Sequence, residues 1–366
     1  ATAGGGATAG GGTAGGASAP FCGNNTRDLG EQCDDGNTIN LDGCSSACTF
    51  EVVQRINYLK MQFGTDMYCT ANQFGSAIGT TAQGQLQTAL DSAINSGTLS
   101  TFFLFRDLND LSGTVDPLLT LGTLRGPPVP GAGYNGASDL DWWYTVDSTT
   151  VDVSRVPLEN NPASLAAKVL NVGPGVLTLP FDFGGGPSNM RLSTARMTIT
   201  LGPTSTPTMS SGMTPGHLAT ERLDPTLQCF ANGGLPNVNG AGRLCGNVAA
   251  TSLAATPIPS VLLPPSSTAC EQTYAVTNSL LDVVIGGCSL FGGFIQLVLP
   301  RQPDTQDPGV ASAGAGAPYT LSASPTTRQV NTCRDQSNAV VPLQQCLDDA
   351  AYSAFFHVNF GRVIAR

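Results

Sequence analysis

The sequence predicts a mainly β fold, a sandwich or jelly-roll-like domain with one or two helices, preceded by a small disulfide-rich module and a glycine-rich extension. Only 11% of the 366 residues are charged, whereas 44 are glycine and 25 are proline. This composition is typical of short strands joined by turns and is unfavourable for long helices with surface ion pairs. The apolar runs are rich in valine, isoleucine, threonine and aromatic residues, which favours strands.

Residues 1–20 form the glycine-rich extension, in which the unit Ala-Thr-Ala-Gly-Gly-Gly occurs twice. A six-residue repeat stays in phase both with a strand and with a threefold polyproline-II-like helix, and the small side chains would let either pack closely on another backbone. Glycine loses much conformational entropy when it is ordered, so a partner surface must offset that loss. We therefore expect the extension to dock on a partner. The alternative is a flexible spacer.

Residues 21–51 form the second segment, which contains Cys22, Cys33, Cys44 and Cys48. About thirty residues cannot bury enough apolar surface to fold alone, so crosslinks or a metal must hold them. Zinc is the less favoured choice, because only Cys44 and Cys48 are close in sequence. Disulfides persist in oxidising compartments, which predicts an exported module.

The motifs of this segment are Cys22-Gly23-Asn24, then Gly30-Glu31-Gln32-Cys33-Asp34-Asp35-Gly36-Asn37, and finally Asp42-Gly43-Cys44-Ser45-Ser46-Ala47-Cys48. In these motifs residues 22–51 resemble the cysteine-rich disulfide repeat of myxobacterial surface and secreted proteins. The resemblance covers about a twelfth of the chain. It implies an exported, crosslinked module and carries no activity with it.

The same segment is strongly acidic and offers oxygen ligands on a loop punctuated by glycine. Crowded carboxylates repel one another unless a cation screens them, and oxygen ligands of this kind suit calcium. The spacing differs from that of an EF-hand and lacks its closing glutamate. The alternative is a set of Asx-turns in which the side chains bind their own backbone. The candidate calcium ligands are Asp34, Asp35, Asn37, Asn40 and Asp42.

Residues 52–202 are predicted to form a β-rich domain with one helix. The helix is expected over 81–95, because Leu86, Leu90 and Ile94 share one face and Gly97 follows as a stop. A hairpin turn is predicted at residues 173–175, a Gly-Pro-Gly sequence. Strands are predicted over residues 56–63, 101–105, 141–146, 150–156, 175–181 and 190–201.

Residues 203–216 are rich in proline, serine and threonine and are predicted to be a linker or long loop. Residues 217–366 are predicted to form a disulfide-containing, β-rich second half, either a separate unit or one domain with 52–202. We expect short helices near Leu227 and Leu253, buried elements over 279–299 and a terminal strand over 353–364. In that strand Phe356, Val358 and Phe360 face one way and His357 and Asn359 the other.

Seven cysteines remain beyond the module, so at least one has no partner among them. Six cysteines allow fifteen connectivities, and a preference for short loops favours neighbours in sequence. Cys69 is then left over as a free thiol or an interchain link. The favoured pairs are Cys229 with Cys245, Cys270 with Cys288, and Cys333 with Cys346.

Signatures of catalysis are scarce, and we expect no enzymatic activity. The only histidines are His217 and His357, and no nucleophile elbow, zinc-protease motif or P-loop occurs. The best candidate for sugar binding is the aromatic group Trp142, Trp143 and Tyr144, which acidic residues flank. Its alternative, which we favour, is a strand whose aromatic side chains alternate between core and surface.

The net charge of −10 and the presence of only two lysines argue against a nucleic-acid partner. Glycines and polar residues interrupt the most apolar run, residues 279–300, so we expect no transmembrane segment. The chain begins at Ala1 without a basic and apolar leader, which fits export followed by cleavage of a signal peptide. The expected location is extracellular or on the cell surface.

These observations lead to the hypothesis of an extracellular structural subunit that assembles with copies of itself into a surface filament or sheath. The extension of one copy would lie in a groove or along a strand edge of the next, a contact that propagates because it does not close. The alternative is a secreted calcium-dependent adhesin or carbohydrate-binding protein, in which calcium orders the acidic loop.

Overall fold

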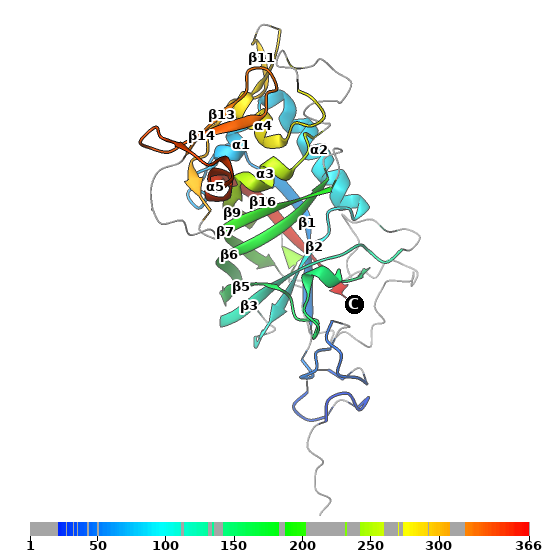
Figure 1. Cartoon of the computed structure of the whole chain (residues 1–366). Coiled ribbons are helices and arrows are strands. Elements are labelled where there is room, and N and C mark those ends of the chain that lie inside the picture. The colour runs from blue at the N-terminus through cyan, green and yellow to red at the C-terminus, as the bar shows by residue number, and fades with distance from the viewer. Residues whose placement is uncertain are drawn as a thin grey trace, which may run out of the picture.

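The fold is mainly β, as predicted (Figure 1). Its centre is one large antiparallel sheet, and five short to medium helices accompany it in the part of the chain that is described. The computed structural model describes residues 21–26, 28–31, 33–34, 36–41, 44–49, 51–110, 113–130, 134, 142–182, 187–202, 231–232, 242–259, 270, 274–291, 293–307 and 319–365.

Eight strands of this sheet form a closed ring, because the first strand pairs with the last. The sequence analysis expected two packed sheets, whereas the structure has one sheet that curls until its edges meet. Closure leaves no free edge along the paired length. In ring order the strands are β1 (Val52–Met61), β2 (Thr101–Arg106), β3 (Val115–Arg125), β5 (Glu159–Ala166), β6 (Val169–Asp182), β7 (Pro187–Gly202), β9 (Gly242–Ala249) and β16 (Ala350–Ala365).

Apolar side chains fill the inside of the ring. Phe356, Val358 and Phe360 of β16 are buried in the main core, on the face that the sequence pattern predicts. A register shift between Ile56 and Tyr58 lets β1 keep its own apolar residues on that face. The gap that remains near Phe103, Leu121 and Asn161 has a volume of about 10 Å³, no more than one water molecule. The ring therefore encloses a packed core and no ligand cavity at this place.

The helices gather at one end of the strands, and the N-terminal module lies at the opposite end (Figure 1). Helix α2 (Thr80–Ser96) confirms the predicted helix, with Leu86, Leu90 and Ile94 buried and Gly97 in the left-handed conformation as its C-cap. The other helices are α1 (Gln73–Ala77), α3 (Ala250–Ala255), α4 (Leu280–Gly286) and α5 (Leu343–Asp349), and none of those described is long and apolar enough to span a membrane.

A long insertion separates β9 from β16 and carries the last three helices. The strands in it pair with one another, except that β12 (Thr305–Gln306) pairs with β16. Residues on both sides of the predicted linker at 203–216 thus contribute to the same ring, and that linker lies outside the described residues. The remaining short elements are β4 (Trp143–Tyr144), η1 (Ser148–Thr150), β8 (Ala231–Asn232), β10 (Cys288–Leu290), β11 (Ile295–Val298), β13 (Thr320–Ala323), β14 (Val330–Arg334) and β15 (Val340–Val341).

The module joins the ring through one apolar residue. Leu41 is completely buried in a second core on the outside of β1, β2 and β16, together with Trp142 and Tyr144. Its carbonyl accepts a hydrogen bond of 3.1 Å from the guanidinium of Arg155, and Asn40 donates to the carbonyl of Ser154 at 3.3 Å. These contacts fix the module against the ring.

Five disulfides crosslink the chain, and they correct one predicted pair. Cys245 pairs with Cys69 and not with Cys229, so the preference for short loops was wrong there. The ring brings the segment after β1 next to β9 although 176 residues separate the two cysteines. Cys229 lies outside the described residues. The other bonds are Cys22–Cys48 and Cys33–Cys44 in the module, and the predicted pairs Cys270–Cys288 and Cys333–Cys346.

Two predicted local elements were also wrong. Residues 150–156, predicted as a strand, form a turn in which the Asp152 carboxylate accepts the backbone N–H groups of Ser154 and Val156. The Gly173–Pro174–Gly175 sequence, predicted as a hairpin turn, lies inside β6 as an irregularity in its pairing with β7. The helix expected near Leu227 lies outside the described residues.

Candidate functional site

The ring has a gap in its wall between β5 and β6. These strands pair through their backbones only from Ala163 and Val172 to the hairpin turn, although β6 continues to Asp182. Pairing ends at Pro162 on β5 and just before Gly173 and Pro174 on β6, and proline has no N–H group to donate to a neighbouring strand. The far half of β6 thus pairs with β7 on one side and lacks a strand partner on the other among the described residues.

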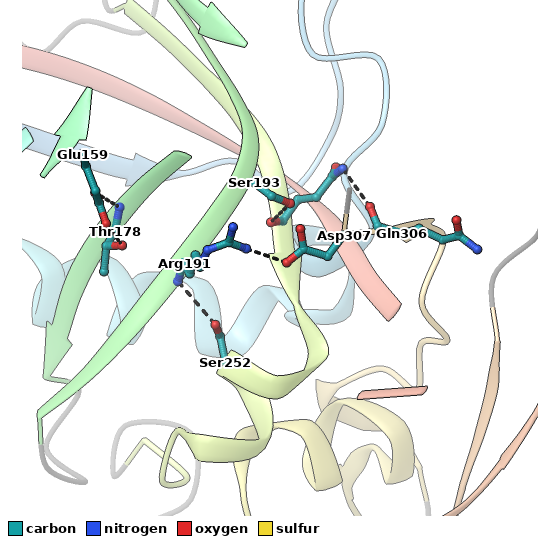
Figure 2. A network of polar contacts seen from close by, with 8 residues as sticks. Glu159, Thr178, Arg191, Ser193, Ser252, Gln306 and Asp307 are labelled. Carbon is teal, nitrogen blue, oxygen red and sulfur yellow. Dashed lines mark hydrogen bonds and ion pairs between the residues drawn. The ribbon is translucent and has the colours of Figure 1, made fainter. Parts of the chain in front are cut away.

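Two side chains of β5 close the first part of this gap. The Asn161 amide binds both the N–H and the carbonyl of Val176, at 2.8 and 2.9 Å. The Glu159 carboxylate accepts the N–H of Thr178 at 3.1 Å and its hydroxyl at 2.5 Å, as Figure 2 shows. Side chains therefore take the place of a strand as far as Thr178. Beyond it, the next residue on that edge is Pro180.

A polar groove begins at Pro180. Its volume is about 390 Å³, room for roughly a dozen water molecules. Pro180 of β6 and Asn189 of β7 line one side, and the end of β3, the loop after α2 and the turn at η1 line the other. The polar side chains that line the groove are Thr98, Ser100, Arg125, Asp147, Thr149 and Asn189.

The two charges in the groove are held in place. The guanidinium of Arg125 donates to the side-chain carbonyl of Asn189 at 3.0 Å, which links the end of β3 to β7 across the groove. The Asp147 carboxylate accepts the N–H and the hydroxyl of Thr149, both at 2.9 Å. The hydrogen bond from the Thr149 backbone, more than the nearby Arg125, holds the pKa of Asp147 below its usual value despite partial burial. The groove thus presents one fixed cation and one fixed anion.

Two glycines in the wall opposite Pro180 let its backbone segments pack closely. A side chain at Gly126 would meet the carbonyl oxygen of Thr145 at 1.7 Å, and one at Gly97 would meet Pro128 at 2.6 Å. Gly97 also has a φ of +78°, which disfavours any other residue. The bank opposite β6 is therefore made of closely packed backbone, a shape that admits an extended chain with small side chains.

The predicted calcium ligands lie in the module, away from this groove. The Asp34 carboxylate accepts four backbone N–H groups, those of Gly23, Asn24, Asn25 and Gly36, at 2.8 to 3.1 Å. Burial acts against the charged form, but these hydrogen bonds hold the pKa of Asp34 below its ordinary value. The carboxylate is thus engaged by the backbone in the manner of Asx-turns.

The other described ligand candidates make similar local bonds. Asn37 accepts the N–H of Ile39 at 2.6 Å, and Asn40 accepts the N–H of Ser46 at 2.9 Å. Asp35 and Asp42 lie outside the described residues. A cluster of potential metal ligands in the described part of the module combines Glu31 and Asp34 with Cys48, whose sulfur belongs to a disulfide.

The predicted sugar-binding aromatics lie in the second core. Trp142 and Tyr144 are 1% and 0% exposed, whereas Trp143 between them is half-buried. The Trp142 indole donates to the carbonyl of Val129 at 2.9 Å, and the Tyr144 hydroxyl shares a 2.6 Å hydrogen bond with that of Tyr134. Rings that are buried in this way present no stacking face to a sugar.

A second polar cluster connects the insertion to the outside of the ring (Figure 2). Arg191 of β7 forms an ion pair of 2.5 Å with the buried Asp307, and its backbone N–H reaches Ser252 at 3.4 Å. Ser193 and Gln306 both bind Asn247 of β9 at 3.4 Å. These groups satisfy one another and join β7, β9, α3 and β12, which indicates a structural role.

His357 lies on the outer face of β16 and is only 7% exposed. Burial, together with the charges of Arg243 and Lys60, lowers the pKa of this imidazole, and the Asp66 carboxylate acts in the opposite direction. Its Nδ1 has no hydrogen-bond partner within the described structure. His217 lies outside the described residues.

The sequence analysis missed the groove. Its residues come from five places in the chain, and each is an ordinary polar residue, glycine or proline. One feature of the sequence could have indicated an interruption in strand pairing at this place. Pro162, Pro174 and Pro180 are all in β5 or β6, and proline in a strand indicates an edge or an interruption in pairing.

The comparisons with known proteins concern the module alone. A family model described as a domain of unknown function, DUF4215, matches residues 17–49, and both disulfides within that segment agree with a cysteine-rich unit. No curated protein and no solved structure matches the chain. What the comparisons establish is that the cysteine-rich segment is similar to DUF4215.

Proposed function

We propose that this protein is an extracellular structural subunit that assembles with copies of itself into a surface filament or sheath. The contact that propagates the assembly is the capture of residues 1–20 of one copy in the groove beside β6 of the next. The five disulfides support the extracellular setting, because such bonds persist where the surroundings are oxidising.

The observation that carries the proposal is the polar groove at Pro180, where β6 continues past the side chains of Asn161 and Glu159 and has no strand partner on that side among the described residues. An extended segment can add to such an edge and bind through its main chain, with side chains deciding only whether it fits. The extension consists mainly of glycine, alanine and threonine, so its side chains fit between β6 and the backbone bank at Gly97 and Gly126.

A contact of this kind is head to tail, since it joins two different surfaces of the subunit. When the extension binds a second copy, the contact repeats and an open chain of copies forms. When the extension fills the groove of its own copy, the protein remains a monomer. Threonine hydroxyls of the extension complement the hydroxyls of Thr98, Ser100 and Thr149. Arg125 and Asp147 remain paired to neighbours and need no charged ligand.

The groove also supports a role without catalysis. Asp147 is the one carboxylate among the described residues that line it, it already accepts the N–H and the hydroxyl of Thr149, and no histidine or cysteine lines the groove beside it.

The direct test is to delete residues 1–20 and to measure assembly by sedimentation and negative-stain imaging. We expect native material to form filaments and the truncated chain to remain a folded monomer. A blocking variant, Thr149→Trp, keeps the extension but fills the groove and should also stay monomeric. Thr88→Trp on the exposed side of α2 is the matched control and should still assemble. Filaments from either the truncated or the blocked protein would contradict the proposal.

The second candidate is a calcium-dependent adhesin or carbohydrate-binding protein. The observation that favours it is the set of hydroxyl, amide and charged side chains in the groove, which are groups that bind sugars. In this case glycan binding would depend on calcium and would not depend on residues 1–20. Binding that a chelator abolishes and the truncation leaves unchanged would favour the adhesin over the filament.

A further inference from the structure

The hairpin of β10 and β11 ends in two exposed phenylalanines. Phe291 is 74% exposed and Phe294 is 92% exposed, whereas Leu290 and Ile295 behind them are half-buried against the main core. Figure 1 shows β11 at the end of the molecule opposite the N-terminal module. Exposed aromatic rings that are neighbours on one turn form an apolar tip, which in a soluble domain marks a contact surface.

The base of this hairpin is rigid. Cys288 at the start of β10 is bonded to Cys270. Strand β11 lies directly on the segment between α1 and α2, where Gly79 donates to the carbonyl of Leu297 at 2.9 Å and Leu299 donates to that of Ala77 at 2.6 Å. A side chain at Gly79 would meet the carbonyl oxygen of Gln296 at 1.8 Å, so the two segments touch along their backbones.

The turn itself presents the rings in a backbone conformation that a phenylalanine rarely adopts. Phe291 has a φ of +53°, and the N–H of Phe294 reaches its carbonyl at 3.4 Å. A bulky residue in the left-handed region costs conformational energy, and both rings are in contact with water. Contact of the two rings with an apolar surface outside the protein would offset both the backbone strain and the exposure to water.

The charge pattern indicates what those surroundings are. No charged residue occurs between Asp282 and Arg301, so the whole hairpin and its flanks are neutral. Only glycines separate the two phenylalanines in the sequence, so no polar side chain lies between them there. Phenylalanine side chains at the end of a neutral projection suit shallow insertion into a lipid bilayer, where apolar side chains lie at the boundary between the headgroups and the acyl chains.

We propose that the β10–β11 hairpin is a lipid-contact tip through which the protein rests on a neutral bilayer surface, with Phe291 and Phe294 inserted at the headgroup level. The binding is hydrophobic and shallow. Because the molecule carries a net charge of −10 and the tip has none, attraction to anionic lipid does not contribute and salt does not weaken the binding.

The test is flotation of the full-length protein with phosphatidylcholine vesicles at low and high salt. We expect the wild-type protein to float with the vesicles under both conditions. The double variant Phe291→Ser/Phe294→Ser should bind less by about tenfold for each ring removed. Both side chains are exposed, so thermal unfolding of this variant should match that of the wild type.

The matched control is Leu118→Ser/Val153→Ser, which removes two apolar side chains that are 82% and 104% exposed elsewhere on the molecule. This control should float like the wild type. Failure of the wild type to float, or equal loss in the control, would overturn the proposal. The proposal would also be overturned if the wild-type protein formed dimers without vesicles and only the phenylalanine variant lost those dimers. The tip would then bind a second copy.

Discussion

The N-terminal module and the strand ring show two different ways of holding a chain in one conformation. The ring is held by burial, with four aromatic or branched side chains of β16 alone inside its core. The module has two disulfides and a carboxylate that accepts four backbone N–H groups, and its fully buried aliphatic residue, Leu41, belongs to a core that the ring supplies.

This difference follows from size. A ring of eight strands encloses enough volume for a packed interior, whereas thirty residues do not. In the module, covalent bonds reduce the freedom of the unfolded chain, and Asp34 satisfies backbone groups that a core would otherwise hide. The module and the ring should therefore respond to different perturbations. The following experiments test the stability of each region by itself.

The largest effect is expected from Phe356→Ala in β16. Phe356 is fully buried in the ring, and removing its side chain leaves a cavity that the neighbouring strands cannot fill. We expect a loss of about 4 kcal/mol in the free energy of unfolding of the ring. Chemical denaturation followed by near-ultraviolet circular dichroism measures this loss. Phe21→Ala, at a residue that is 68% exposed, is the control and should have little effect.

A somewhat smaller effect, confined to the module, is expected from Cys33→Ala/Cys44→Ala. This change opens a loop between cysteines 11 residues apart, which lowers local stability by about 3 kcal/mol in the chain-entropy treatment. Hydrogen exchange should become fast in the module and stay slow in the ring. The control Cys333→Ala/Cys346→Ala opens a loop of 13 residues in the insertion and should leave exchange in the module unchanged. Loss of protection throughout the ring in the first variant would contradict the separation.

Leu41→Ala tests the joint between the two regions. This substitution removes the apolar contact of the module with Val53 and Trp142 while both disulfides remain. We expect the module to keep its own structure and to lose about 2 kcal/mol of its docking on the ring, at the low end for a buried leucine. Limited proteolysis after residue 51 should become faster. Leu29→Ala, at a side chain that is 98% exposed in the same module, should cleave at the wild-type rate.

The smallest effect concerns acid. The pKa of Asp34 is lowered in the folded module, so the charged form stabilises the fold above the ordinary aspartate pKa of about 3.9 and that contribution is lost as the pH falls through the folded value. The module should therefore loosen below about pH 4 while the ring persists. Amide chemical shifts of Gly23 and Asn25, which donate to this carboxylate, report the transition. Asp34→Asn should abolish it, whereas Asp335→Asn in the insertion should not alter it.

Much of the fold could be predicted from local sequence. Strands with alternating or continuous apolar residues, such as β2 and β16, and the amphipathic α2 appear where the pattern indicates them. The missed strands β3, β5 and β9 contain proline, asparagine or glycine. The glycines have a steric reason, since a side chain at Gly122 would meet Pro157 at 2.6 Å and one at Gly246 would meet Leu192 at 3.0 Å. Such neighbours are set by the tertiary fold and leave no local signal.

Closure of the sheet and the groove could not be predicted for a related reason. The pairing of Val53 with Val363 joins residues at opposite ends of the described chain, and no local pattern specifies it. The same is true of Asn161, whose amide is ordinary in sequence and becomes a substitute for a strand only once β6 lies beside it. The Cys69–Cys245 bond escaped prediction because it depends on that closure.

The Cys69–Cys245 bond also decides how the molecule would respond to mechanical pulling. Force applied through the two ends of the chain enters at β1 and β16, which are neighbours in the ring, and would separate them like a zipper. The bond carries the force past the stretch between its cysteines, which are 176 positions apart, so that stretch bears no tension even when the ring opens. Full extension would otherwise release roughly 600 Å of slack from it, at about 3.4 Å for each residue. Under load the protein therefore lengthens less than it would without this bond.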